Sequence, residues 1–223
     1  PTLTAKGSIG LRILQIFAPT VQSSGVVSLD VHASGVKAVQ GQIGFKDVAL
    51  STADAPIGVE KLNGTADVTN DRVQVAKMSA QVGGGEVDIA GAIVYKPSVQ
   101  FNLAVKGKTI RIRYPEGLRT VLDTNLAFSG TTQASLLSGR VLVDNLSFTP
   151  DFDLARFGDQ ISTGTTPSQP GFADTVRLAI AVQTQSSLNA VSSQVSIAGQ
   201  ANLQVGGTAD NPVITGRTTI TSG

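Results

Sequence analysis

The chain has 223 residues, of which 41% are hydrophobic and 15% charged, and its formal net charge is +1. This composition excludes a disordered, highly charged chain, and it provides no long-range positive field for nucleic acid. The absence of cysteine excludes disulfides and thiolate zinc sites, and the single histidine, His32, leaves little basis for a His-based triad. We therefore expect a protein that is not an enzyme, with no cofactor, no metal site and no nucleic-acid partner.

The main pattern along the chain is alternation of apolar and polar residues. In a β-strand successive side chains point to opposite faces, so such alternation predicts a strand with one apolar face. Turn residues at 83–85, 114–117 and 209–212 separate the alternating runs. The prediction is an all-β chain, mostly an antiparallel meander. In chain order the clearest runs are 87–91, 101–105, 110–114, 176–182 and 195–205.

One segment departs from this pattern. Thr149 and Pro150 are suited to the start of a helix, and three apolar residues then recur with helical spacing. We expect a short amphipathic helix over 151–161, followed by a flexible loop rich in Ser, Thr, Pro and Gly. The expected organisation is therefore strand repeats over 1–150, the helix and loop over 151–173, and further strands of the same architecture over 174–223.

Internal repeats give a second signal. Residues 125–131 (NLAFSGT) resemble 202–208 (NLQVGGT), and Gly139-Arg140 resembles Gly216-Arg217 at the same offset of 77 residues. A shorter copy, 102–107 (NLAVKG), stands 23 residues before the first. Repeated strand-turn-strand units predict a sheet that grows along one axis.

The apolar face of these strands is aliphatic. The chain contains eight Phe, two Tyr and no Trp. Two arrangements fit such a face: an ordinary sandwich of two sheets packed with aliphatic side chains, or a curled sheet with an open apolar groove. The residue pattern alone leaves both open.

Three stretches carry a family resemblance. They are residues 62–91, with Leu62-Asn63-Gly64-Thr65 and the glycine run at 83–85, residues 108–154, which include IRIRYPEGLR, and residues 203–216 (LQVGGTADNPVITG). Together they resemble the TamB family and the related AsmA-like proteins. The stretch 108–154 is the most specific of the three.

The resemblance implies an elongated, curled, mostly antiparallel sheet that forms an open groove in the periplasm of a Gram-negative bacterium. It also implies an inner-membrane anchor outside this sequence; we expect the chain, which begins at Pro1 and stops within a strand-like run, to be a fragment. The implied partners are phospholipid acyl chains, an outer-membrane barrel of the Omp85 class such as TamA, and client β-strands added to an open sheet edge. The implied roles are phospholipid transport between the membranes and assistance in outer-membrane protein assembly and secretion.

Candidate site residues are identified from the alternation. A basic cluster could contact lipid headgroups, although a solvated outer face explains it as well. For that role we single out Lys106, Lys108, Arg111 and Arg113. The groove candidates are the apolar residues of the alternating runs: Val87, Ile89, Phe101, Leu103, Val105, Ile110, Ile112, Leu126, Phe128, Val176, Leu178, Ile180, Val195, Ile197, Leu203 and Val205.

A second hypothesis is a secreted structural or adhesive β-solenoid, similar to an autotransporter passenger. The 23-residue offset between Asn102 and Asn125, about the length of one solenoid rung, supports it. A solenoid buries its interior permanently and should bind no lipid, whereas an open groove should.

Overall fold

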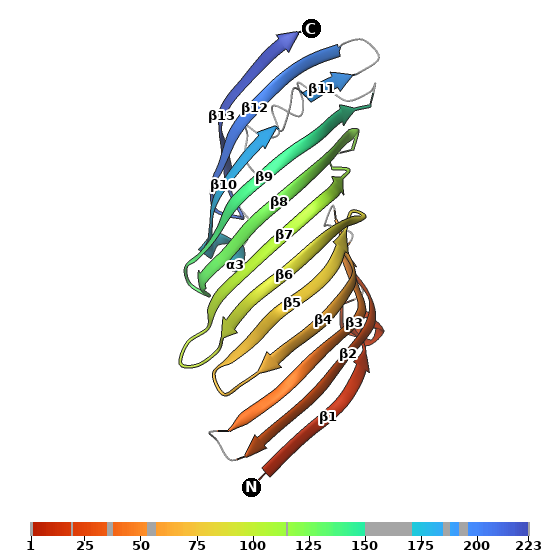
Figure 1. Cartoon of the computed structure of the whole chain (residues 1–223), viewed down its shortest axis with the longest axis vertical. Helices are drawn as coiled ribbons and strands as arrows, with labels where there is room; N and C mark the ends of the chain where they lie inside the picture. The colour runs from red at the N-terminus through yellow and green to blue at the C-terminus, as the bar shows by residue number, and fades with distance from the viewer. Residues whose placement is uncertain are drawn as a thin grey trace. The chain divides into compact units, whose positions relative to one another are not determined.

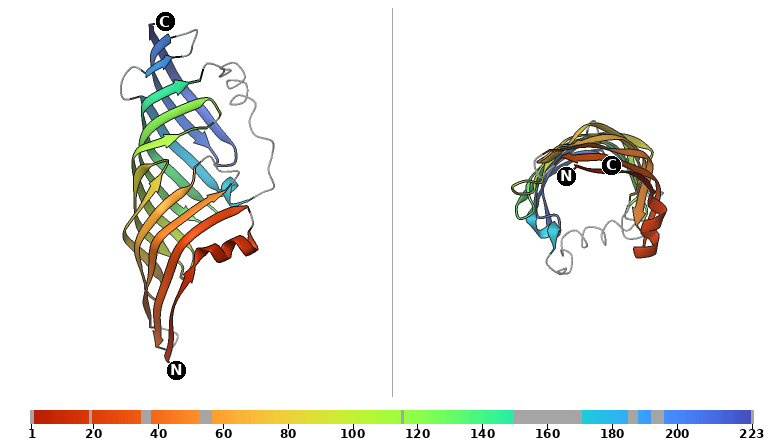
Figure 2. Two further views of the ribbon diagram at one scale, coloured as in Figure 1. Left: turned by 90° about the vertical axis from the view of Figure 1, so that its right-hand side faces the viewer. Right: turned by 90° about the horizontal axis from the view of Figure 1, so that it is seen from below.

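The computed structural model describes residues 2–18, 20–34, 38–52, 57–114, 116–149, 171–184, 188–191 and 196–222. For 188–191, 196–197 and 221–222 it describes the backbone alone. The chain divides into two compact units, Pro1–Gly107 and Lys108–Gly223, and the division falls within strand β7 (Gln100–Ile112). In each unit the strands form a curved layer (Figures 1 and 2).

The first unit is an antiparallel meander in which each strand pairs with the next, from β1 to β6. Two short helical segments, η1 (Leu11–Ile13) and α1 (Leu14–Phe17), connect its first two strands. Its strands are β1 (Thr2–Gly10), β2 (Val21–Ser34), β3 (Val39–Thr52), β4 (Val59–Val68), β5 (Arg72–Val82), β6 (Gly85–Val94) and the first part of β7.

The second unit contains one parallel pairing among its described strands. Strand β9 pairs antiparallel with β8 and parallel with β10, which comes after the short helix α3 (Phe172–Thr175). Strand β12 then pairs antiparallel with β10, β11 and β13. The strands are β8 (Leu118–Thr131), β9 (Ser135–Phe148), β10 (Val176–Thr184), β11 (Leu188–Val191), β12 (Ser196–Gly207) and β13 (Pro212–Ser222).

The predicted all-β, mostly antiparallel fold is confirmed. In the described part of the chain each predicted run falls in a strand, although 101–105 and most of 110–114 belong to the single strand β7. The predicted turns lie between strands, except that Gly85 and Pro212 are the first residues of β6 and β13. The short helices α1 and α3 were not predicted. The helix expected over 151–161 lies outside the described residues, and the expected organisation into 1–150, 151–173 and 174–223 stays a prediction.

The described strands provide no second layer. They form one hydrogen-bonded path, with β13 joined to β12, so the sandwich alternative is not supported. The largest buried cluster, Ala66, Val75 and Met78, lies on one face of the first unit. The antiparallel pairing of successive strands also differs from the parallel pairing of successive rungs expected in a solenoid.

Bulges interrupt the alternation within several strands. Around Asp47 in β3 and Lys61 in β4 the register shifts against both neighbouring strands, and both residues have φ of 49°. Strand β5 shifts in the same way between Val75 and Met78. Because a bulge inserts one extra residue, it changes which residues of the strand face each side.

At Asp47, and at a further irregular position in β7, a side chain from the next strand accepts a hydrogen bond from the backbone N–H. The N–H of Asp47 donates to Asn63 Oδ1 at 3.0 Å. In β7, Thr109 has φ of 55° and its N–H donates to Asp123 Oδ1 at 2.8 Å. An Asn or Asp on the adjacent strand therefore satisfies a donor that the regular ladder does not.

The 77-residue repeat corresponds to two equivalent pairings. Leu126 pairs with Gly139 in β8–β9, and Leu203 pairs with Gly216 in β12–β13. Both glycines have positive φ, 138° and 142°. A Cβ atom on Gly139 would lie 2.2 Å from the Asn125 carbonyl oxygen, and one on Gly216 would lie 2.3 Å from that of Asn202. The repeat thus preserves a close backbone approach that only glycine permits.

We expect Gly139→Ala to lower the free energy of unfolding by about 2–4 kcal/mol, because alanine would combine an unfavourable φ with a backbone clash. Urea unfolding followed by far-UV circular dichroism measures this change in a chain that contains no tryptophan. The matched control is Gly206→Ala. A Cβ on Gly206 would meet only backbone oxygens at 4.0 Å, so the control should change stability by less than about 1 kcal/mol. Equal losses in the two variants would contradict this explanation of the repeat.

A second prediction concerns the irregularity in β7. Asp123→Ala leaves the Thr109 N–H without its acceptor and should destabilise the chain by about 1 kcal/mol. Asp123→Asn retains the side-chain carbonyl oxygen, so its loss of stability should be less than half of the loss in Asp123→Ala. The same unfolding measurement tests both, and an identical loss in both variants would show that the acceptor oxygen is not what stabilises this part of β7.

Candidate functional site

Fourteen of the predicted groove residues are described with their side chains, and all are buried or half-buried. Val87, Ile110 and Val176 are each 6% exposed. The residues between them along the strands, such as Asn102, are mostly exposed. The alternation therefore identified the less exposed face, here called the apolar face. Val195 and the side chain of Ile197 lie outside the described residues.

In the second unit the apolar side chains form rows across the sheet. Directly paired residues point to the same face, so the register of the strands defines each row. One row runs Leu126, Gly139, Ile180, Val205, Ile214 across β8, β9, β10, β12 and β13. The next row runs Thr124, Val141, Val182, Leu203, Gly216 across the same strands. The candidates from three sequence runs thus share one continuous face.

The irregularity at Thr109 explains why the β7 candidates change from odd to even numbers. Phe101, Leu103 and Val105 are half-buried, and Ile110 is buried beyond the irregularity. Lys108 and Thr109 are both exposed. One extra residue therefore returns the apolar side chains to the apolar face.

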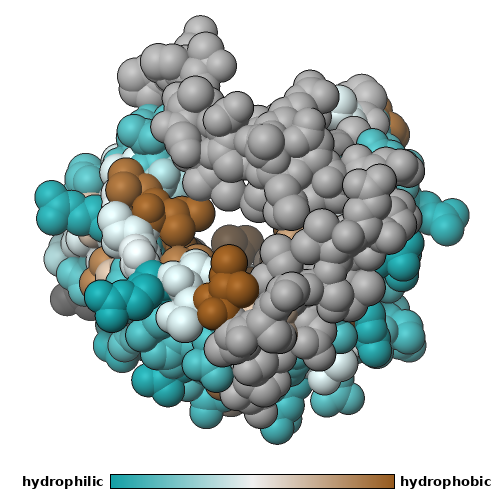
Figure 3. All heavy atoms as spheres, turned by 90° about the horizontal axis from the view of Figure 1, so that it is seen from above, coloured by the Kyte–Doolittle hydropathy of each residue, from teal (hydrophilic) through white to brown (hydrophobic). Residues whose placement is uncertain are grey.

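Among the described residues, no second sheet lies over the apolar face. Helix α3 covers part of the apolar face, because its Phe172 ring packs edge to face against the Phe128 ring, with the ring centroids 6.4 Å apart. Phe172 itself is 50% exposed. In the space-filling view, hydrophobic residues lie beside a hollow, and hydrophilic residues lie towards the periphery (Figure 3). No side chain in the described part of the chain is less than 2% exposed, which fits a one-layer structure.

The four basic candidates are exposed. Lys106 and Arg111 alternate with the apolar residues Val105, Ile110 and Ile112, so they point to the opposite, polar face. A headgroup contact by Lys106, Lys108, Arg111 and Arg113 stays a prediction, and the position of Lys106 and Arg111 favours a solvated outer face.

His32 meets a hydroxyl and a carboxylate that the sequence did not connect with it. Its Nδ1 lies 3.2 Å from Thr4 Oγ1, and its Nε2 lies 3.1 Å from Asp30 Oδ1. Lys6 donates a hydrogen bond to Asp30 and lowers the pKa of that carboxyl group. The His32 side chain is 64% exposed. His32 therefore lies on the solvent-exposed surface of the paired strands β1 and β2.

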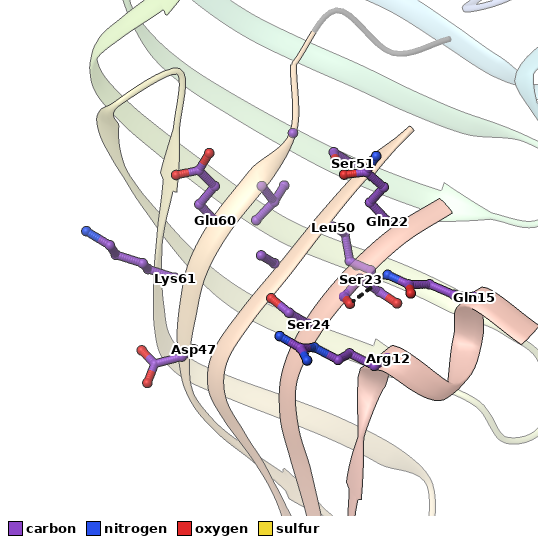
Figure 4. Close-up of a pocket in the computed structure, with 13 residues that line it drawn as sticks. Arg12, Gln15, Gln22, Ser23, Ser24, Asp47, Leu50, Ser51, Glu60 and Lys61 are labelled. Carbon is purple, nitrogen blue, oxygen red and sulfur yellow. Dashed lines mark hydrogen bonds between the residues drawn. The ribbon is translucent and has the colours of Figure 1, made fainter. Parts of the chain in front are cut away.

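Sequence reasoning missed a polar cavity in the first unit, beside η1 and α1. Its lining includes Arg12, Ser23 and Glu60. The lining residues are far apart in the sequence, and the pairing of strands β2 to β4 brings them together, so their spacing along the chain did not predict the cavity. Residues 11–17 (LRILQIF), which do not alternate regularly, form the helical segments beside the cavity (Figure 4).

These features define the class: an all-β protein whose described strands form a single layer, with no second sheet over its apolar face in the described part of the chain. In that described part no helix is long and apolar enough to cross a membrane. A family model described as the TamB C-terminal domain matches residues 71–223. The chain belongs to the TamB family, a family of transport and assembly components in the Gram-negative envelope. No curated protein and no solved structure matched the chain.

Proposed function

We propose that the apolar face of this chain carries the acyl chains of phospholipids through the periplasm between the inner and outer membranes. The observation that carries the proposal is the pair of apolar rows in the second unit, which cross β8, β9, β10, β12 and β13 with no second sheet over them among the described strands. Half-buried aliphatic side chains in such rows leave apolar area that a ligand can cover. The gain is about 0.8 kcal/mol for each methylene group removed from water.

The chemistry of the face suits a mobile ligand. Its rows consist mainly of Leu, Val, Ile, Thr and Gly. Apart from the Thr124 hydroxyl, these side chains offer dispersion contacts without directional polar groups, so an acyl chain has no strongly preferred position along a row. Transport along the face then needs no bond to be made or broken.

The wider role is proposed from the family. We infer that transport occurs in a protein anchored in the inner membrane, together with an outer-membrane barrel of the Omp85 class, and assists outer-membrane protein assembly and secretion. Client β-strands are a further proposed cargo. The support for these partners is membership of the TamB family, whereas the support for lipid is the geometry of the apolar face.

The test compares two sets of aspartate substitutions on opposite faces. Leu103→Asp, Leu126→Asp and Ile180→Asp together place carboxylates on the apolar face. Ala104→Asp, Ala127→Asp and Ala179→Asp place the same charge on the neighbouring exposed positions. Each protein is purified gently from a Gram-negative host, and phospholipid per chain is measured by extraction and mass spectrometry. We expect a loss of about tenfold in the first set and less than about twofold in the control set.

Circular dichroism establishes whether each variant retains its β-structure. A photoreactive benzophenone residue placed singly at Leu126 or Ala127 provides an independent measurement with less added charge. Cross-linking to phospholipid from position 126 and not from 127 would support the proposal. A folded wild-type chain that carries no phospholipid, or equal cross-linking from both positions, would contradict it.

A further inference from the structure

Helix α3 places an aromatic ring on the apolar face of the second unit. The Phe172 ring packs edge to face against Phe128. Phe128 pairs with Leu137, and Leu137 pairs with Leu178, so these three residues form a further apolar row across β8, β9 and β10. Because Phe128 follows Leu126 by two residues in β8, this row lies directly beside the row of Leu126 on the same face.

The Phe172 ring lies near the end of the apolar face. The next row towards the turn between β8 and β9 consists of Gly130, Ser135 and Val176. In that row Ser135 is 4% exposed and Val176 is 6% exposed. The row of Phe128 is therefore the last one with half-buried apolar side chains before the strands turn.

The described hydrogen bonds of α3 fix its backbone beside the sheet. Asp174 accepts the Gly171 N–H at 2.7 Å. The Thr175 hydroxyl lies 2.8 Å from the Phe172 carbonyl oxygen and 3.2 Å from that of Thr132, in the turn between β8 and β9. The Phe172 side chain is 50% exposed, so it can leave Phe128 by a change of rotamer while α3 stays in place.

The Phe172 ring and an acyl chain would compete for the same apolar area. Each can remove the surface of Phe128 from water, and they cannot occupy one position together. An edge-to-face ring contact stabilises by about as much as the burial of one or two methylene groups. An acyl chain that lies along the row of Phe128, Leu137 and Leu178 can therefore displace the ring by burying a few more methylene groups.

We propose that Phe172 is a movable cover on the apolar face. An acyl chain that enters the row of Phe128, Leu137 and Leu178 displaces the Phe172 ring, and the ring returns when the acyl chain leaves. This inference rests on the proposed function. It adds a residue outside the rows that regulates how far acyl chains extend towards the turn between β8 and β9.

The first test measures lipid at the covered row. A photoreactive benzophenone residue is placed singly at Leu137, or at Leu126 in the neighbouring row, in the full chain. Each protein is incubated, below saturation, with vesicles of phosphatidylethanolamine and phosphatidylglycerol. Phe172→Ala should raise cross-linking to phospholipid from position 137 by about threefold, a factor within the range expected for the loss of one ring contact. Cross-linking from position 126 should stay nearly unchanged.

The matched control is Phe17→Ala. It removes the same side chain from the first unit, where Phe17 is 80% exposed, and should leave cross-linking from both positions unchanged. Circular dichroism establishes that each variant retains its β-structure. A purely structural contact between Phe172 and Phe128 would not raise lipid binding when the ring is removed.

A second measurement follows the ring position itself. The chain contains no tryptophan, so Phe172→Trp provides a single indole as a reporter at the cover. Loading with phospholipid, followed by removal of the vesicles, should move the indole into water and shift its emission to longer wavelength. The same loading should cause no such shift in Phe17→Trp.

The outcomes separate this inference from the proposed function. If neither position 126 nor position 137 cross-links to phospholipid, the proposed function fails. If position 126 cross-links but Phe172→Ala leaves cross-linking from position 137 unchanged or lowers it, lipid transport stands and the cover is overturned. An emission of Phe172→Trp that is unchanged on loading, or that shifts to shorter wavelength, would also overturn the cover.

Discussion

The structure depends on keeping apolar side chains on one face of each curved layer of strands. Because side chains alternate with a period of two, a shift of one residue would send every later apolar side chain of a strand to the polar face. In β5 the less exposed positions change from Val73 and Val75 to Met78 and Ala80, and the register shifts between Val75 and Met78. The bulges are therefore matched to phase changes in the sequence, and together they preserve a single apolar face.

The same bulges connect the fold to the polar cavity. At Asp47 and Lys61 the extra residue restores the apolar phase for the remainder of the strand, and it also leaves charged side chains where the strand is locally irregular. In a regular strand the side chains would alternate strictly, and the apolar residues after these positions would point to the polar face. The charged cavity in the first unit is thus a local consequence of the adjustment that keeps Val48 and Leu62 on the apolar face.

Local patterns predicted the strands and most of the apolar face, because alternation and turn residues act over a few positions. The pairing of Leu126 with Gly139 and of Leu203 with Gly216 gives the repeat a physical cause. Features that depend on partners distant in sequence were not predictable. One example is the hydrogen bond that the Thr109 N–H donates to Asp123, and another is the parallel pairing of β9 with β10. The polar cavity needs three paired strands and a helical segment at once, which no single spacing encodes.

Passage of a lipid along a sheet and tight recognition of its headgroup make opposite demands on a surface. Tight recognition of a headgroup requires fixed charges at defined positions, and each such contact slows release. Movement along a sheet requires a surface on which successive positions are nearly equal in free energy. In the second unit the rows consist of aliphatic side chains, glycine and one threonine, and they contain no charged residue. Exposed charged side chains beside the rows, such as Arg140 and Arg177, alternate with Gly139 and Leu178 and so point away from them. The rows therefore suit the proposed passage of acyl chains along the sheet better than the tight binding of one headgroup.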